Sequence, residues 1–232
     1  MKIGLIFPNK DRKDKTVHLG LGYIAAFSRI VHPDLEFTIL DTRIATKNQT
    51  KKFYSSNFDL IGITVLSPIY YEAVSIVENI NKNFPNIPIC LGGPYVTTIM
   101  EEIFDDMNVK YAVYGEGEIT FSELISHLKQ QKNIEEINGL MYKLNDNKIS
   151  KNPPREQINN LDTIPFPAYD LFKMNKYPMH RITTTRGCPY KCVFCNSTSI
   201  WDWKWRKRDV EHIVEEIQFL IKNYGKKVFF FF

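Results

Sequence analysis

Over its first 131 residues the chain alternates short apolar segments with longer segments of helical period. The apolar segments, which we expect to be strands, are 2–7, 36–40, 59–65, 88–91 and 111–114. Apolar residues recur at helical spacing over 20–31, 69–83 and 120–131. Strands that alternate with helices favour a parallel sheet covered on both faces. The sequence therefore predicts an α/β fold with a Rossmann-like, doubly wound parallel sheet.

Small residues follow two of the predicted central strands. Ser67 comes after 59–65, and Gly92 and Gly93 come after 88–91. Ligands of doubly wound sheets bind beyond the carboxyl ends of the strands, where glycine lets a ligand approach the backbone. A glycine after a strand is also what a tight turn requires. We expect a ligand site at this edge, with Ser67, Gly92 and Gly93 as candidate contacts.

Cys188, Cys192 and Cys195 follow the spacing CxxxCxxC and are three of the four cysteines in the chain. Such a cluster typically places several thiolates on one metal centre, and three thiolates leave one position of a four-ligand site open to a small molecule. The alternative is a zinc site completed by His180 or His212, although the second ligand pair of common zinc sites is missing. The remaining cysteine, Cys90, is predicted to be a small buried apolar residue.

After residue 131 the sequence changes character. Residues 132–180 contain a predicted hairpin around 145–147 and then a linker interrupted by prolines. Residues 181–232 contain two predicted strands, 181–185 and 227–232, with a helix between them. A β/α unit takes about 30 residues, so 181–232 holds fewer than two units. We expect the chain to be a fragment or interrupted reading frame of a longer protein.

Composition limits the kinds of partner. A net charge of +4 in 232 residues is too small to indicate a nucleic acid partner. No apolar run approaches the roughly 18 residues of a membrane span. Clustered cysteines without dispersed partners suit a reducing compartment, so we expect a cytoplasmic protein.

The cysteine region resembles the cluster-binding motif of the radical S-adenosylmethionine (radical SAM) enzymes. Residues 183–187 read as a strand that runs into a glycine turn just before the first cysteine, and Phe194 precedes the third. The resemblance implies that Cys188, Cys192 and Cys195 hold a [4Fe–4S] cluster whose unique iron binds S-adenosylmethionine. It also implies that Phe194 lies near the adenine of S-adenosylmethionine.

The first 131 residues resemble the cobalamin (B12)-binding domain that precedes many radical SAM domains. The matching segments are 19–26, 59–73, 89–97 and 111–125. The Asp-x-His-x-x-Gly motif, whose histidine ligates cobalt in some corrinoid proteins, is missing, because Thr16 stands where the aspartate would precede His18. The resemblance therefore implies either cobalamin whose lower face has no protein ligand or a domain that keeps only the fold. His18 is then expected to be a surface histidine.

The resemblances divide the chain into a cobalamin-binding-like domain (1–131), a hairpin and linker (132–180) and the start of an incomplete radical SAM barrel (181–232). They imply reductive cleavage of S-adenosylmethionine and cobalamin-dependent methyl transfer to an unreactive carbon of a small molecule. The electron donor would be flavodoxin- or ferredoxin-like.

No residue stands out as catalytic, and a chain with so little of the barrel is not expected to be active alone. One alternative is a non-catalytic fragment that binds cobalamin or a cluster. A methylthiotransferase is a further alternative, disfavoured because that family carries three more cysteines in its N-terminal domain.

Overall fold

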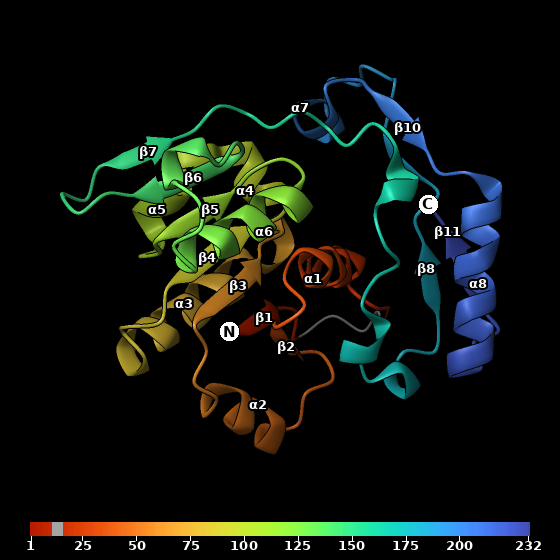
Figure 1. Cartoon of the computed structure of the whole chain (residues 1–232), viewed down its shortest axis with the longest axis horizontal. Coiled ribbons are helices and arrows are strands. Elements are labelled where there is room, and N and C mark those ends of the chain that lie inside the picture. Colours follow the sequence, from red (N-terminus) through yellow and green to blue (C-terminus); the bar gives the residue numbers. More distant parts are fainter. Residues whose placement is uncertain (11–15) are drawn as a thin grey trace.

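The computed structural model describes residues 1–10 and 16–232, apart from the side chains of 198 and 199 (Figure 1). Its largest sheet has seven strands in the order β2-β1-β3-β4-β5-β6-β7. The first five strands run parallel: β1 (Lys2–Phe7), β2 (Glu36–Asp41), β3 (Leu60–Thr64), β4 (Ile89–Gly92) and β5 (Tyr111–Val113). The order 2-1-3-4-5 is that of flavodoxin-like doubly wound folds, in which ligands bind where the strand order reverses.

Helices cover both faces of this sheet, as the alternating sequence pattern predicts. On one face, α1 (Leu19–Val31) and α6 (Gly117–Leu128) bury Leu21, Phe121 and their neighbours against β1 and β3. On the other face lie α2 (Lys47–Tyr54), α3 (Tyr70–Asn83), α4 (Pro94–Ile99) and α5 (Ile103–Asp106). The side chains of each strand alternate between these two cores because a β-strand has a period of two. The predicted α/β fold with a doubly wound sheet is confirmed.

The predicted hairpin forms and extends the sheet beyond residue 131. Strand β6 (Leu140–Lys143) pairs antiparallel with β5, and β7 (Ile149–Lys151) pairs antiparallel with β6. Asn147, in the turn between β6 and β7, has a φ of 64°, a conformation that asparagine tolerates better than most residues. The sequence pattern indicates the hairpin but carries no sign of its partner strand.

The rest of the chain forms a second, smaller unit beside α1 (Figure 1). Strand β8 (His180–Ile182) pairs parallel with β11 (Phe229–Phe231), and β9 (Thr185–Gly187) pairs antiparallel with β10 (Trp205–Lys207). The predicted strand over 181–185 is therefore two short strands with different partners. Two helices, α7 (Ser197–Trp201) and α8 (Val210–Tyr224), complete this unit. Helix α8 ends at Gly225, whose left-handed φ of 63° suits glycine.

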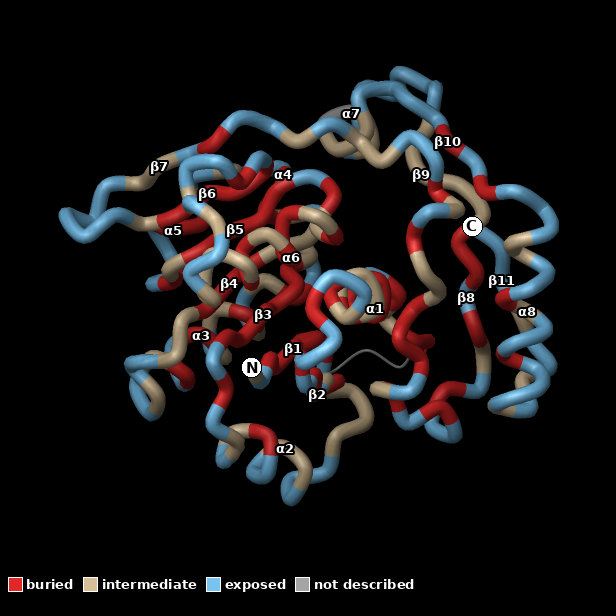
Figure 2. The backbone as a smooth tube through the Cα atoms, viewed as in Figure 1, coloured by how far each residue is buried: buried red, intermediate tan, exposed pale blue. Residues whose placement is uncertain are grey.

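The linker packs against both units. Leu161, Tyr169 and Tyr177 of the linker share a core with Tyr23 of α1 and Leu220 of α8. In Figure 2 the buried residues lie mainly in the central strands of the seven-stranded sheet and in parts of the linker, whereas much of α8 is exposed. Short 3-10 turns occur at Ser67–Ile69, Met100–Glu102, Ile134–Glu136, Leu161–Thr163, Tyr169–Leu171 and Met174–Lys176. Within the described ranges, no helix is both long and apolar enough to cross a membrane.

Burial of His180 predicts a loss of stability in acid. The side chain at the start of β8 is 1% exposed, and neither ring nitrogen has a hydrogen-bond partner among the described residues. Burial, assisted by the charge of Lys226, lowers the pKa of His180 from 6.5 to about 4. The unfolded chain therefore binds this proton more readily, so stability is full above pH 6.5 and falls as the pH drops toward 4.

Between pH 7 and pH 5 we expect His180 to lower the free energy of unfolding by about 2 kcal/mol. Urea denaturation at both pH values measures the difference. His180→Phe should remove about that share of it, whereas His127→Phe, at a half-buried position, serves as the comparison. An unchanged pH dependence in His180→Phe would contradict the expectation.

Candidate cofactor-binding site

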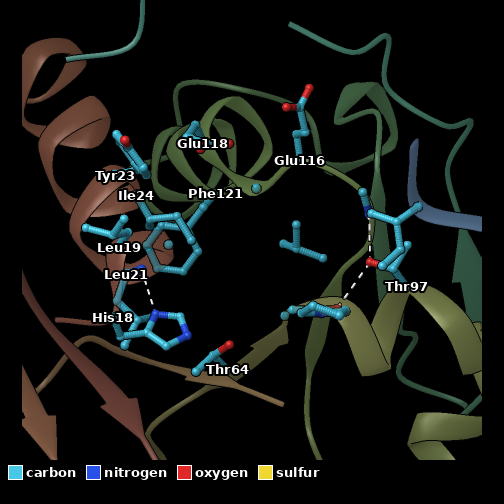
Figure 3. A pocket seen from close by; sticks show the side chains of 18 of the residues that line it. His18, Leu19, Leu21, Tyr23, Ile24, Thr64, Thr97, Glu116, Glu118 and Phe121 are labelled. Carbon is cyan, nitrogen blue, oxygen red and sulfur yellow. Dashed lines mark hydrogen bonds between the residues drawn. The ribbon is translucent and has the colours of Figure 1, made fainter. Parts of the chain in front are cut away.

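A cavity of about 520 Å³ lies at the carboxyl ends of β3, β4 and β5, at the edge where the topology predicts a ligand (Figure 3). Helices α1 and α6 form one wall, and β9 with α7 of the smaller unit closes over it. Its lining is mostly apolar: Leu21, Ile24 and Phe121 are typical members. Its size and apolar character are those of pockets that hold organic ligands or cofactors.

Glycines shape the floor of this cavity. A Cβ added to Gly92 would meet no protein atom closer than 3.8 Å, and one added to Gly115 would meet none within 4 Å. The open space beside both glycines therefore belongs to the cavity. Gly93 differs, because its φ is +102° and a Cβ there would lie 2.8 Å from the Thr64 hydroxyl. The Thr97 hydroxyl ties the two glycine turns together, since it accepts from the Gly115 N–H at 3.0 Å and donates to the Gly93 carbonyl at 3.2 Å.

Two of the three residues predicted to contact a ligand at this edge line the cavity. Gly92 and Gly93 do so, whereas Ser67 is exposed and is not part of the lining. Thr64 and Leu66, which precede Ser67, are the lining residues from this stretch. Strand β3 ends at Thr64 and Ser67 begins the 3-10 turn Ser67–Ile69, so Ser67 does not continue the strand whose end lines the cavity.

His18 is half-buried at the start of α1, so the prediction of a surface histidine is wrong. Its Nδ1 accepts a hydrogen bond from the Leu21 N–H at 3.2 Å, which makes His18 the N-cap of the helix. Burial and the neighbouring Arg43 lower its pKa from 6.5 to about 4. The ring is therefore neutral at pH 7, and because Nδ1 accepts, the proton sits on Nε2. A protonated Nε2 donates hydrogen bonds and does not bind a metal.

The three clustered cysteines lie on the loop that follows β9. Cys188 and Cys195 are half-buried and Cys192 is exposed, with the Cys195 N–H donating to the Cys192 carbonyl at 3.0 Å. Within the described part of the chain, no three His, Cys, Asp or Glu side chains are arranged to hold a metal ion. The donors suit an iron–sulfur cluster chemically, and metal sites commonly take their final shape only when the metal binds.

Phe194, predicted to lie near adenine, is 89% exposed and does not line the cavity. Among the described residues, neither histidine of the zinc alternative forms a group with the cysteines that could hold a metal ion. His180 is buried in β8, while His212 Nδ1 lies 2.8 Å from the Asp162 carboxylate and its ring stacks on Phe166. Cys90 is buried, as predicted, and burial raises the pKa of its thiol.

A cluster of buried charges at the mouth of the cavity has no counterpart in the sequence-based predictions. Arg186 donates to Glu116 at 2.8 Å and to Glu118 at 2.6 Å, and Arg206 donates to the second oxygen of Glu116 at 2.9 Å. Burial raises the pKa of Glu116, but its hydrogen bonds to the two arginines outweigh this effect and leave the pKa below its ordinary value. Glu116 is 70 residues from Arg186 and 90 residues from Arg206 in the sequence. The matched stretches 111–125 and 183–187 contain Glu116, Glu118 and Arg186, so their charges could have been noticed there, whereas no sequence signal marks Arg206.

Comparison with protein families supports both parts of this site. The family described as B12 binding domain matches residues 10–125, and the Radical SAM superfamily matches residues 182–232. The first match falls on the domain built around the seven-stranded sheet, called here the sheet domain. The second falls on the smaller unit that carries the cysteine loop.

Two curated relatives are methyltransferases. An uncharacterized methyltransferase of Pyrococcus horikoshii is 36% identical over 98% of this chain and 52% of its own length. The cytidylyl-2-hydroxyethylphosphonate methyltransferase of Streptomyces wedmorensis is 26% identical over 90% of this chain and 49% of its own length. The chain thus spans about half the length of the curated relatives it matches.

The same fold occurs in a solved structure. The cobalamin-dependent S-adenosylmethionine radical enzyme OxsB, solved with aqua-cobalamin and S-adenosylmethionine bound, superposes with a TM-score of 0.78. The match has 22% sequence identity and covers 95% of this chain and 31% of OxsB. At this identity the similarity establishes the fold.

Proposed function

We propose that this chain, which belongs to the radical SAM proteins with an N-terminal B12-binding domain, is the cofactor-binding part of a cobalamin-dependent radical SAM methyltransferase. One observation carries the proposal. The glycine-floored cavity of the B12-binding domain is closed by β9, and β9 leads directly into the CxxxCxxC loop. A cofactor in the cavity and a cluster on the loop would therefore face the same space.

Different residues of the chain would bind the two cofactors. Cys188, Cys192 and Cys195 would hold a [4Fe–4S] cluster, and Gly92 and Gly115 would leave room for cobalamin. When bound, the cluster supplies the electron that cleaves S-adenosylmethionine, and cobalamin supplies a methyl carrier. The apolar walls at Leu21, Ile24 and Phe121 exclude water from the cavity.

The proposal extends to partners and location. Both curated relatives described above are methyltransferases, which favours methyl transfer as the reaction. The substrate would be a small molecule, and the electron would come from a flavodoxin- or ferredoxin-like protein. An oxygen-sensitive cluster on an exposed loop suits the reducing cytoplasm. Phe194 stays a predicted contact of S-adenosylmethionine, whereas Ser67, exposed outside the cavity lining, is left out of the proposed cobalamin site.

Anaerobic reconstitution tests the proposal. The protein is incubated with iron, sulfide and cobalamin, freed of unbound cofactor, and studied by absorption and electron paramagnetic resonance (EPR) spectroscopy. We expect retained cobalamin, a [4Fe–4S] signal after reduction, and a change in that signal when S-adenosylmethionine is added. Retention of the cluster without cobalamin would contradict the cobalamin-dependent part of the proposal.

Replacement of His18 should leave cobalamin affinity nearly unchanged. Its Nδ1 is engaged by the Leu21 N–H and its pKa is about 4, so a cobalt bond would cost the helix its cap. His18→Ala should lower the free energy of unfolding by about 1 kcal/mol, the usual cost of a lost N-cap. Equilibrium binding measured by absorption checks the affinity, and His18→Asn, which keeps a capping group, should recover the stability. A large loss of binding in both folded variants would mean that His18 ligates cobalt.

A further inference from the structure

The ends of the cysteine loop are fastened to the B12-binding domain. Arg186 stands two residues before Cys188, and its guanidinium bridges Glu116 and Glu118 in the turn from β5 into α6. Asn196 directly follows Cys195, and its side-chain amide donates to the Thr98 hydroxyl of α4 at 2.6 Å. Both attachments cross from the smaller unit to the sheet domain.

The attachment through Arg186 is the stronger of the two. The side chains of Arg186, Glu116 and Glu118 are 11%, 4% and 6% exposed, so solvent screens their charges little. The planar guanidinium also lies 5.3 Å from the ring centroid of Tyr23 on α1. A guanidinium fork held by two carboxylates and an aromatic face has a defined orientation, which a lysine ammonium would not reproduce.

The backbone next to Arg186 is also restricted, because it packs closely against another segment of the smaller unit. Gly187 has a φ of +92°, and a Cβ there would lie 1.8 Å from the Lys204 carbonyl oxygen. The chain therefore passes close to the start of β10 immediately before Cys188. The middle of the loop is free by comparison, since Val193 and Phe194 are 103% and 89% exposed.

We infer that Arg186 is a positioning residue that sets where a cluster on the cysteine loop sits relative to the cavity of the B12-binding domain, with Asn196 as a weaker second attachment. The inference rests on the proposed function. Glu116 also accepts from Arg206 at 2.9 Å and from the Ile158 N–H at 2.7 Å, so the carboxylate that orients Arg186 is itself fixed by β10 and the linker. The geometry between two cofactors matters because methyl and radical transfer depend steeply on the separation of the reacting atoms.

The first experiment measures the separation spectroscopically. In protein loaded with cobalamin and cluster, a reduced cluster speeds the electron-spin relaxation of cob(II)alamin in a way that falls steeply with distance. Arg186→Gln should take up both cofactors yet lose most of this enhancement, and Asn196→Ala should lose a smaller part. A purely structural role for Arg186 would change thermal stability and leave the relaxation of the loaded protein unchanged.

Arg155→Gln is the matched control. Arg155 lies in the linker and, like Arg186, is paired with a carboxylate of α6, Glu123, but it does not adjoin the cysteine loop. The Arg155→Gln variant should show the same cob(II)alamin relaxation as the wild type. If Arg186→Gln does not fold, the same relaxation is measured in Arg186→Lys and Glu118→Gln, because each of these variants keeps part of the attachment. Wild-type relaxation in every folded variant at Arg186 and Glu118 would overturn the inference.

A second measurement needs no cofactor and so separates this inference from the proposed function. Trypsin must draw several residues around Lys191 into its active site in an extended form, so the rate of cleavage after Lys191 in the metal-free protein reports how often the ends of the loop detach. Loss of a hydrogen bond to a charged group should raise the cleavage rate in Arg186→Gln about tenfold or more, with no change in Arg155→Gln. A wild type that binds neither cofactor would defeat the proposed function, and equal cleavage rates in all three proteins would defeat the inference.

Discussion

Alanine at Cys188, Cys192 or Cys195 is expected to abolish iron uptake, which is the largest effect we predict for any single substitution. Thiolates are the ligands that an iron–sulfur cluster requires, and alanine offers no donor atom. Two remaining cysteines would leave two of the four irons of the cluster without a protein ligand, one more than the single open position that S-adenosylmethionine would fill. The measurement is iron and sulfide content after anaerobic reconstitution, with the absorption of the cluster as a second readout.

Cys90→Ala is the control for these three variants. Cys90 lies in β4 with 2% exposure, and the structure places it in the core of the sheet domain. Iron uptake in Cys90→Ala should equal that of the wild type. Stoichiometric zinc with no iron in the wild-type protein would overturn the cluster assignment and favour the alternative of a zinc site.

Leucine at Gly92 should weaken cobalamin binding roughly 5- to 150-fold, the factor that overpacking costs of about 1–3 kcal/mol produce. Gly92 ends β4 without a positive φ, so its backbone accepts other residues. The nearest protein atom to an added Cβ is 3.8 Å away, and the leucine side chain would therefore fill the cavity and leave the fold intact. Circular dichroism checks the fold and equilibrium binding gives the affinity.

Ser67→Ala provides the comparison for the Gly92 variant. Ser67 is exposed outside the cavity lining, so its loss should change cobalamin affinity by less than about twofold, as is usual for surface substitutions. Gly93 is a poorer choice of variant, because its φ of +102° would add backbone strain to any steric effect. Equal binding by the wild type and Gly92→Leu would show that cobalamin does not use this cavity.

Local sequence patterns were sufficient for the five parallel strands and for α1, α3 and α6, whereas α2, α4 and α5 have no counterpart among the predicted helices. The short apolar runs of β1 and β3, and the helical spacing in α1 and α3, depend on neighbours a few residues away, so they can be read directly from the chain. The same holds for Gly92 and Gly93, since a glycine pair after a central strand is both a turn signal and a place for a ligand. The CxxxCxxC spacing likewise identifies its donors without reference to the fold.

Local patterns did not determine which elements become neighbours. The hairpin of β6 and β7 was predictable, but its place as the antiparallel continuation of β5 depends on contacts across about 30 residues. The predicted strand over 181–185 divides between β8 and β9 because its two halves have different partners, β11 and β10.

The environment of individual polar side chains also came only from the tertiary structure. His18 has no local mark that separates a surface histidine from a half-buried helix cap, and its low pKa arises from burial and from Arg43. Arg186 and Glu118 are 68 residues apart, and each alone reads as an ordinary charged residue. The sequence thus predicts the donors of the site and determined most of the elements that carry it. Their mutual position was decided by packing, because burial and ion pairing depend on segments that the folded chain brings together from far apart.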